Sequence, residues 1–172
     1  MSEPSDLPAT GHLQTRRPWV RDGLSAAIAG YVSSVIVYTI VDLTLEHSLF
    51  FAARTLGADI LGAGRAAAHP FLTILTYDGI RFLVVAAVGL LMSAAIRLSW
   101  TLPRLSVLAV VGGVLVLVMS EGVLLLVARP VSAVHFWWVV VAANLVAGLA
   151  MALVVVHRFL LRQLQEIGRR MG

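Results

Sequence analysis

One uninterrupted apolar stretch constrains the fold of this chain more than any other feature. Residues 105–128 read LSVLAVVGGVLVLVMSEGVLLLVA. An α-helix needs about twenty predominantly apolar residues to cross the hydrocarbon core of a bilayer, and this stretch has that length. It holds one ionisable group, Glu121. A charged carboxylate at that depth costs roughly 3 kcal/mol, so Glu121 is expected to be neutral or to meet a polar partner from another span.

The whole chain shares this apolar character. Of its 172 residues, 59% are hydrophobic and only 13% are charged, and its mean hydropathy is +0.92. A soluble domain of this size could not bury so much apolar surface. We therefore predict an all-α, polytopic integral membrane protein whose fold is a four-transmembrane-helix bundle in contact with the lipid bilayer.

Apolar blocks of span length together predict a single membrane domain over residues 24–161. The predicted spans are residues 24–45, 77–98, 105–128 and 131–157. Residues 1–23 have no apolar period and predict a disordered tail. The last block stays apolar for longer than a bilayer requires, and it continues into residues 158–172, which predict a basic C-terminal helix.

The segment between the first two spans, residues 48–73, interleaves charged and apolar side chains. Four apolar positions share one helical face: Leu49, Ala53, Leu56 and Ile60. Residues 48–61 therefore predict an amphipathic helix in the membrane interface. The GAGR sequence at residues 62–65 predicts a flexible turn, and Pro70 leads into the next span. A re-entrant loop between the helices is the alternative for this segment.

Small residues recur every four positions in three of the predicted spans, and such rows allow helices to approach closely. The predicted packing seams are Ala26, Gly30 and Ser34 in the first span, Gly89 and Ser93 in the second, and Gly148 and Ala152 in the fourth. This is more packing surface than a four-helix monomer obviously uses. It favours association with other membrane subunits or with further copies of the chain.

The distribution of arginine predicts the orientation of the spans. One side of the predicted topology carries Arg16, Arg17, Arg21, Arg97, Arg104, Arg158, Arg162, Arg169 and Arg170, and the other carries Arg54, Arg65 and Arg129. The positive-inside rule then places both termini in the cytoplasm of a bacterial-type inner membrane. The predicted interfacial anchors are Trp19, Trp100, Trp137 and Trp138. Because the basic residues do not form one face, nucleic-acid binding is not expected.

A cluster of polar residues is predicted inside the bundle. Asp42, Arg81 and Glu121 fall at similar depth, roughly 5 to 12 Å inside their span ends, and Asn144 lies nearer the middle of its span. Arg81 is expected to pair with Glu121 or Asp42, because a guanidinium binds a carboxylate in bidentate fashion and keeps its proton. Alternatively, Arg81 snorkels to the interface or pairs with Asp78. The cluster either fixes helix register or forms part of a proton or ion path.

Motifs for catalysis and cofactor binding are missing from the sequence. The chain has no Cys, which excludes thiolate chemistry and Cys-based metal sites. It has no HExxH, GxSxG or phosphate-loop pattern, so we predict that it is not an enzyme and holds no metal. His47, His69 and His135 are expected near the outer face, in a loop and an aromatic belt, so haem binding is not expected.

Three functions are compatible with the sequence. The leading hypothesis is a small non-catalytic subunit that scaffolds or stabilises a larger respiratory or transport complex of the inner membrane. The second is a homo-oligomeric channel or transporter with a polar path through Asp42, Arg81, Glu121 and Asn144. The third is lipid or quinone binding beneath the amphipathic helix.

Overall fold

The computed structural model describes residues 18–46, 48–98, 105–127 and 137–171, and these ranges contain helices and no strands. The elements in chain order are α1 (Pro18–Val41), the π-helical turn η1 (Asp42–Glu46), α2 (Phe51–Leu61), α3 (Ala63–Ala68), α4 (Pro70–Leu98), α5 (Leu105–Val127) and α6 (Trp137–Met171). The predicted all-α class is confirmed for this part of the chain.

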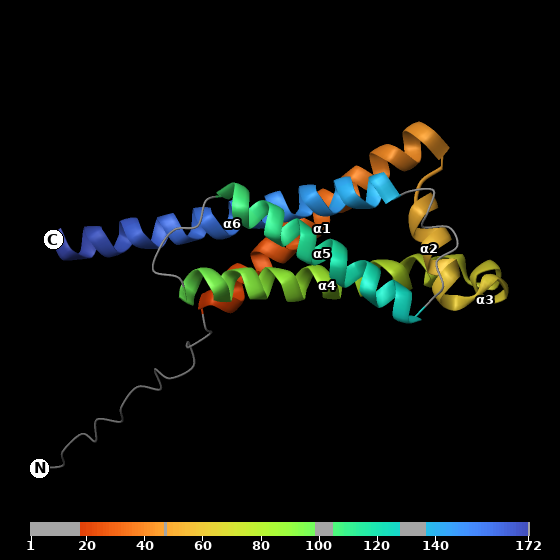
Figure 1. Cartoon of the computed structure of the whole chain (residues 1–172), viewed down its shortest axis with the longest axis horizontal. Coiled ribbons are helices and arrows are strands. Elements are labelled where there is room, and N and C mark those ends of the chain that lie inside the picture. Colours follow the sequence, from red (N-terminus) through yellow and green to blue (C-terminus); the bar gives the residue numbers. More distant parts are fainter. Residues whose placement is uncertain (1–17, 47, 99–104, 128–136, 172) are drawn as a thin grey trace, which may run out of the picture.

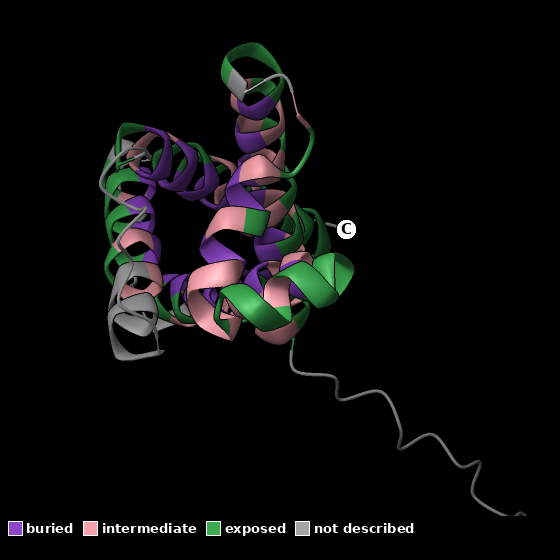
Figure 2. Cartoon of the chain, turned by 90° about the vertical axis from the view of Figure 1, so that its right-hand side faces the viewer, coloured by how far each residue is buried: buried purple, intermediate pink, exposed green. Residues whose placement is uncertain are grey.

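The four long helices run along the molecule in alternating directions, and the short helices α2 and α3 lie together at one end (Figure 1). Helix α6 packs against both α1 and α5, and α1 also packs against α4. Helix α2 packs against α4. Buried residues face the inside of this assembly and exposed ones its outer faces (Figure 2).

Within the described ranges, three helices are long and apolar enough to cross a membrane: Pro18–Leu45, Pro70–Ile96 and Trp137–Met171. On α1, large aliphatic side chains recur every four residues on the outer face, and each is 44% to 56% exposed: Leu24, Ile28, Val32, Ile36 and Ile40. Such an apolar stripe is stable against lipid acyl chains and unfavourable against water. The chain is therefore a multi-pass membrane protein.

Glycines bring the backbone of α1 against two other helices. A Cβ atom added to Gly30 would lie 2.6 Å from Cγ of Met151 on α6. On α4, a Cβ atom added to Gly89 would lie 2.7 Å from the carbonyl oxygen of Gly23 on α1. Real Cβ atoms do not approach other atoms so closely, so each of these helix contacts is possible only because glycine has no side chain.

Helices α5 and α6 meet in the same way. A Cβ atom added to Gly148 on α6 would overlap the backbone nitrogen of Gly113 and the carbonyl oxygen of Ala109. All of the predicted seam residues are buried within this one chain. The expectation of surplus packing surface is therefore wrong, because the small residues of each helix are used by its neighbours in the same bundle.

The observed helices begin earlier than the sequence indicated. Helix α1 starts at Pro18, so part of the predicted tail is helical, while residues 1–17 lie outside the described residues. Helix α4 starts at Pro70 and not near residue 77. Proline suits the first turn of a helix, because that turn needs no N–H donor. In this polar start of α1, Asp22 forms an ion pair with Arg162 of α6.

Other boundaries also differ from the prediction. The first helix gives way at Asp42 to the turn η1. In the predicted 62–65 turn, Gly62 alone has a positive φ, of 82°, and helix α3 begins at the next residue. Helix α6 continues through residue 158 without interruption, so the predicted basic C-terminal helix extends the last span and is not a separate element.

Replacing Gly148 with alanine is expected to lower the free energy of unfolding by about 1–3 kcal/mol, because the added methyl group meets rigid backbone of α5. The matched control is Gly79→Ala on α4, where nothing lies within 4 Å of the added atom. Unfolding of both variants in mild detergent, followed by circular dichroism, measures the difference. Equal stabilities would contradict the close α5–α6 contact.

Candidate functional site

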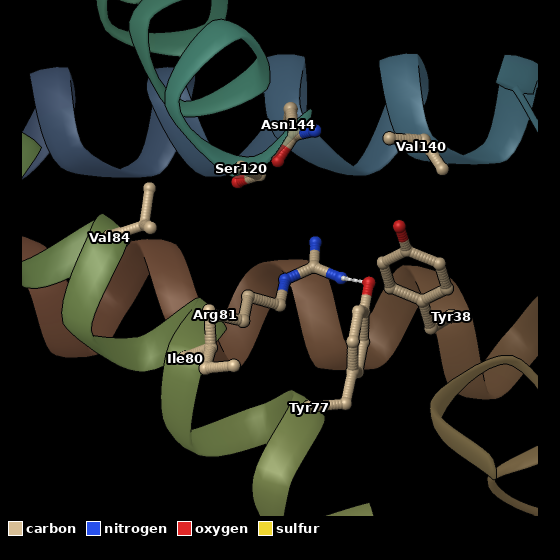
Figure 3. A pocket seen from close by; sticks show the side chains of 8 residues that line it. All are labelled: Tyr38, Tyr77, Ile80, Arg81, Val84, Ser120, Val140 and Asn144. Carbon is tan, nitrogen blue, oxygen red and sulfur yellow. Dashed lines mark hydrogen bonds between the residues drawn. The ribbon is translucent and has the colours of Figure 1, made fainter. Parts of the chain in front are cut away.

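Arg81 projects from α4 into the bundle and is only 5% exposed. One terminal nitrogen, Nη1, donates a hydrogen bond of 3.3 Å to the hydroxyl of Tyr77. Its guanidinium carbon lies 4.1 Å from the centre of the Tyr38 ring on α1 (Figure 3). The two tyrosines thus replace part of the water that would surround this charge in solution.

Beside the guanidinium is a small cavity, which we call the arginine chamber. Its walls are formed by Tyr38, Tyr77, Ile80, Arg81, Val84, Ser120, Val140 and Asn144, which come from all four long helices (Figure 3). The centre of a water molecule can occupy about 10 Å³ of it. That is close to the space of a single water molecule.

Several polar atoms of the chamber walls are buried without a partner. Within the described residues, Nε and Nη2 of Arg81, the hydroxyl of Tyr38 and Oδ1 of Asn144 make no hydrogen bond. Leaving one such group unsatisfied costs about 1–3 kcal/mol, and more when the group is charged. A folded protein rarely concentrates so many of these groups around one cavity, so the chamber is the strongest candidate for a functional site.

A second cavity adjoins the chamber and shares Tyr38, Tyr77 and Arg81 with it. The centre of a water molecule can occupy about 30 Å³ of this space, and Asp42 and Asp78 also line it. The carboxylate of Asp42 accepts hydrogen bonds of 3.2 and 3.3 Å from the backbone N–H of Ala52. Asp42 therefore holds the turn η1 against the first residues of α2, much as a helix-capping side chain does.

The structure brings some members of the predicted polar cluster together. Arg81 and Asn144 line one chamber, and Arg81 and Asp42 line the adjoining cavity. Among the described residues, no carboxylate lies within ion-pair distance of Arg81, so the predicted pairing with Asp42 or Asp78 is wrong. Asp42 instead binds the backbone of α2. The side chain of Glu121 lies outside the described part, and its pairing with Arg81 stays a prediction.

The sequence contained a signal for one partner of Arg81 that the sequence analysis missed. Tyr77 precedes Arg81 by four residues, and side chains with this spacing are neighbours on a helix. Tyr38 lies in the same four-residue row as Gly30 and Ser34, and this spacing puts it on the same face of the helix. Its position over the guanidinium depends on the packing of α1 against α4 and could not be derived from spacing.

An ion pair at the other end of the bundle was also not predicted. Arg162 of α6 binds the carboxylate of Asp22 on α1 and donates a 3.2 Å hydrogen bond to the carbonyl of Pro18. On α4, the hydroxyl of Ser93 donates to the carbonyl of Trp19 at 2.8 Å. These contacts fasten the start of α1 to two other helices.

The structure describes only some of the remaining candidate residues. His47, Trp100 and His135 lie outside the described residues, and His69 is exposed between α3 and α4. Trp137 and Trp138 are 65% and 46% exposed at the start of α6. Within the described ranges, no three His, Asp or Glu side chains are grouped so that they could hold a metal ion.

Known proteins offer no further guide to this site. Comparison of the chain with protein-family models, with curated proteins and with solved structures finds no match. The chamber and the helices that enclose it are therefore the basis for a proposed function.

Replacement of Tyr38 by leucine is expected to lower the free energy of unfolding by about 2 kcal/mol, because a desolvated guanidinium loses its contact with the ring. Tyr38→Phe keeps the ring and removes only the hydroxyl, so it should lower the free energy of unfolding by less than Tyr38→Leu does. Detergent unfolding of the purified variants measures both. Equal losses would show that the hydroxyl, and not the ring, stabilises the site.

Proposed function

We propose that this chain is a four-span protein of a bacterial-type inner membrane with both termini in the cytoplasm. Helix α5 supplies the additional span: it has 23 residues, and at about 1.5 Å per residue it is long enough to cross the hydrocarbon core. The alternating directions of α1, α4, α5 and α6 put both ends of the described chain on one side (Figure 1). The excess of arginine on that side supports its placement in the cytoplasm.

Helix α2 is proposed to lie in the interface on the opposite side. It buries Ala52, Ala53 and Leu56 and leaves Arg54 exposed, as a helix at a membrane surface would.

The natural absence of cysteine allows this topology to be tested with single introduced thiols. Gly168→Cys near the C-terminus is expected to react with a membrane-impermeant maleimide only from the cytoplasmic side. Ala67→Cys in α3 is expected to react only from the outside. Both positions are exposed. Labelling of intact spheroplasts and of inverted vesicles distinguishes the sides, and labelling of both thiols from the same side would refute the four-span topology.

Within this topology, the proposed function is that of a non-catalytic channel or transporter with a polar path past the arginine chamber. The observation that carries the proposal is the group of unpaired polar atoms on Tyr38, Arg81 and Asn144 around one cavity. An ionisable side chain inside a membrane bundle is costly and generally marks a path or a binding site. The adjoining cavity extends the polar region toward Asp42 and α2.

An accessory role in a larger complex is the second candidate. The small-residue seams favoured this role in the sequence, but they are buried between helices of the same chain and no longer support it. What favours it now is the end of α6, which extends past the other helices (Figure 1). Its exposed apolar side chains are Leu160, Leu161, Leu164, Ile167 and Met171. Lipid or quinone binding beneath α2 has less support, since Ala53, Leu56 and Tyr77 pack together there.

Flux into proteoliposomes tests the transport proposal. Protons, alkali cations, chloride and small neutral solutes are offered in turn to the purified chain. Arg81→Leu and Asn144→Leu are expected to lower the flux about tenfold or more, because a hydrogen bond to a charged group contributes about 1.5–3 kcal/mol. Leu83→Ala is the control, since Leu83 is 68% exposed on the outer face of α4.

Flux no greater than that of empty liposomes for every solute would refute transport. If the chain then also purified from its native membrane with foreign subunits in equal amounts, the accessory role would be favoured. Flux that is unchanged in Arg81→Leu and Asn144→Leu would show that the path lies elsewhere.

A further inference from the structure

The unpaired atoms of the arginine chamber define what kind of ligand it takes. Nε and Nη2 of Arg81 carry hydrogens and act only as donors, whereas Oδ1 of Asn144 acts only as an acceptor. The hydroxyl of Tyr38 does either. A ligand that satisfies these atoms must therefore accept hydrogen bonds on one side and donate them on the other.

The size of the chamber narrows the choice further. About 10 Å³ is open to the centre of a water molecule, which leaves room for one non-hydrogen atom and its hydrogens. A halide ion accepts hydrogen bonds only, and its negative charge would face the carbonyl oxygen of Asn144. A metal cation would face the guanidinium of Arg81. A neutral water molecule both accepts and donates hydrogen bonds, which suits the mixture of donors and acceptors around the chamber.

We infer that the arginine chamber holds a single water molecule. It accepts a hydrogen bond from Nη2 of Arg81 and donates to the hydroxyl of Tyr38 and to Oδ1 of Asn144. This water links three helices, α1, α4 and α6, through one hydrogen-bonded centre. A buried water with several polar partners is a fixed part of the structure.

The bound water also extends the polar path of the proposed function. The adjoining cavity, lined by Asp42 and Asp78, shares Arg81 and Tyr38 with the chamber. With the water in place, a polar chain runs from that cavity through Arg81 to Asn144 on α6. The part that the water plays in transport rests on the proposed function, but its presence in the chamber does not.

X-ray radiolysis of the full chain in lipid nanodiscs tests for this water. Radiolysis converts water into hydroxyl radicals, which oxidise side chains beside a bound molecule and can be located by mass spectrometry. Tyr38 and Tyr77 are 8% and 7% exposed, and both line the chamber. They are expected to be oxidised several-fold faster than Met151, which is fully buried in the apolar core although methionine is intrinsically reactive. Protection of both tyrosines to the level of Met151 would overturn the inference.

A variant that fills the chamber provides the second measurement. Val140→Ile adds a methylene group to the chamber wall and keeps every polar atom, so oxidation of Tyr38 is expected to fall several-fold. Val139→Ile is the matched control, because Val139 is buried but does not line the chamber. Equal oxidation in both variants would show that the water lies elsewhere and would overturn the inference.

Exchanging the salt separates water from an anion. Oxidation of Tyr38 and Tyr77 is expected to be the same in chloride and in gluconate, and dependence on chloride would assign the chamber to a halide instead. Flux is measured on the same preparations. Oxidised tyrosines without flux would leave the water in place and refute transport, whereas Arg81-dependent flux with protected tyrosines would refute the water alone.

Discussion

Close backbone contact at glycines holds this bundle together. Lipid acyl chains are as apolar as the helix surfaces, so helices in a bilayer associate through packing and hydrogen bonds and gain little from the hydrophobic effect. Gly23 meets Gly89 between α1 and α4, and Gly113 meets Gly148 between α5 and α6. The positions of the four long helices, and therefore of every polar group between them, depend on these contacts.

The arginine chamber lies where this close packing ends. Along α1 the inward-facing residues grow from Gly23 and Gly30 to Tyr38, and α1 and α4 separate toward the end of the molecule that carries α2 (Figure 1). The extra room accommodates two tyrosine rings and the guanidinium of Arg81. Asp42 closes this end by binding the backbone of α2. A large cation is thus enclosed without a described carboxylate partner, and hydrogen-bonding capacity is left free beside it.

Much of the fold could be predicted from local sequence. The helical class and the apolar spans follow from hydropathy, which is a sum over neighbouring residues and needs no knowledge of contacts. Four-residue spacing puts Ala26 and Ser34 in one row, and both side chains are buried. The starts of α1 at Pro18 and of α4 at Pro70 were predicted too late in the sequence. For α1 the reason is that its polar first turn resembled a loop, whereas Asp22 there pairs with Arg162 of α6.

The sequence by itself therefore determined that this chain belongs in a membrane, and which helix faces avoid lipid. Only the tertiary structure decided what those faces meet. Ser93 bonds to Trp19, and Arg162 pairs with Asp22, across 74 and 140 residues of sequence. The tertiary structure likewise placed Tyr38 over Arg81 and brought Asn144 to the same cavity. Helical periodicity gives the direction in which a side chain points, but the partner that it finds depends on which helices pack side by side and at what offset along their axes.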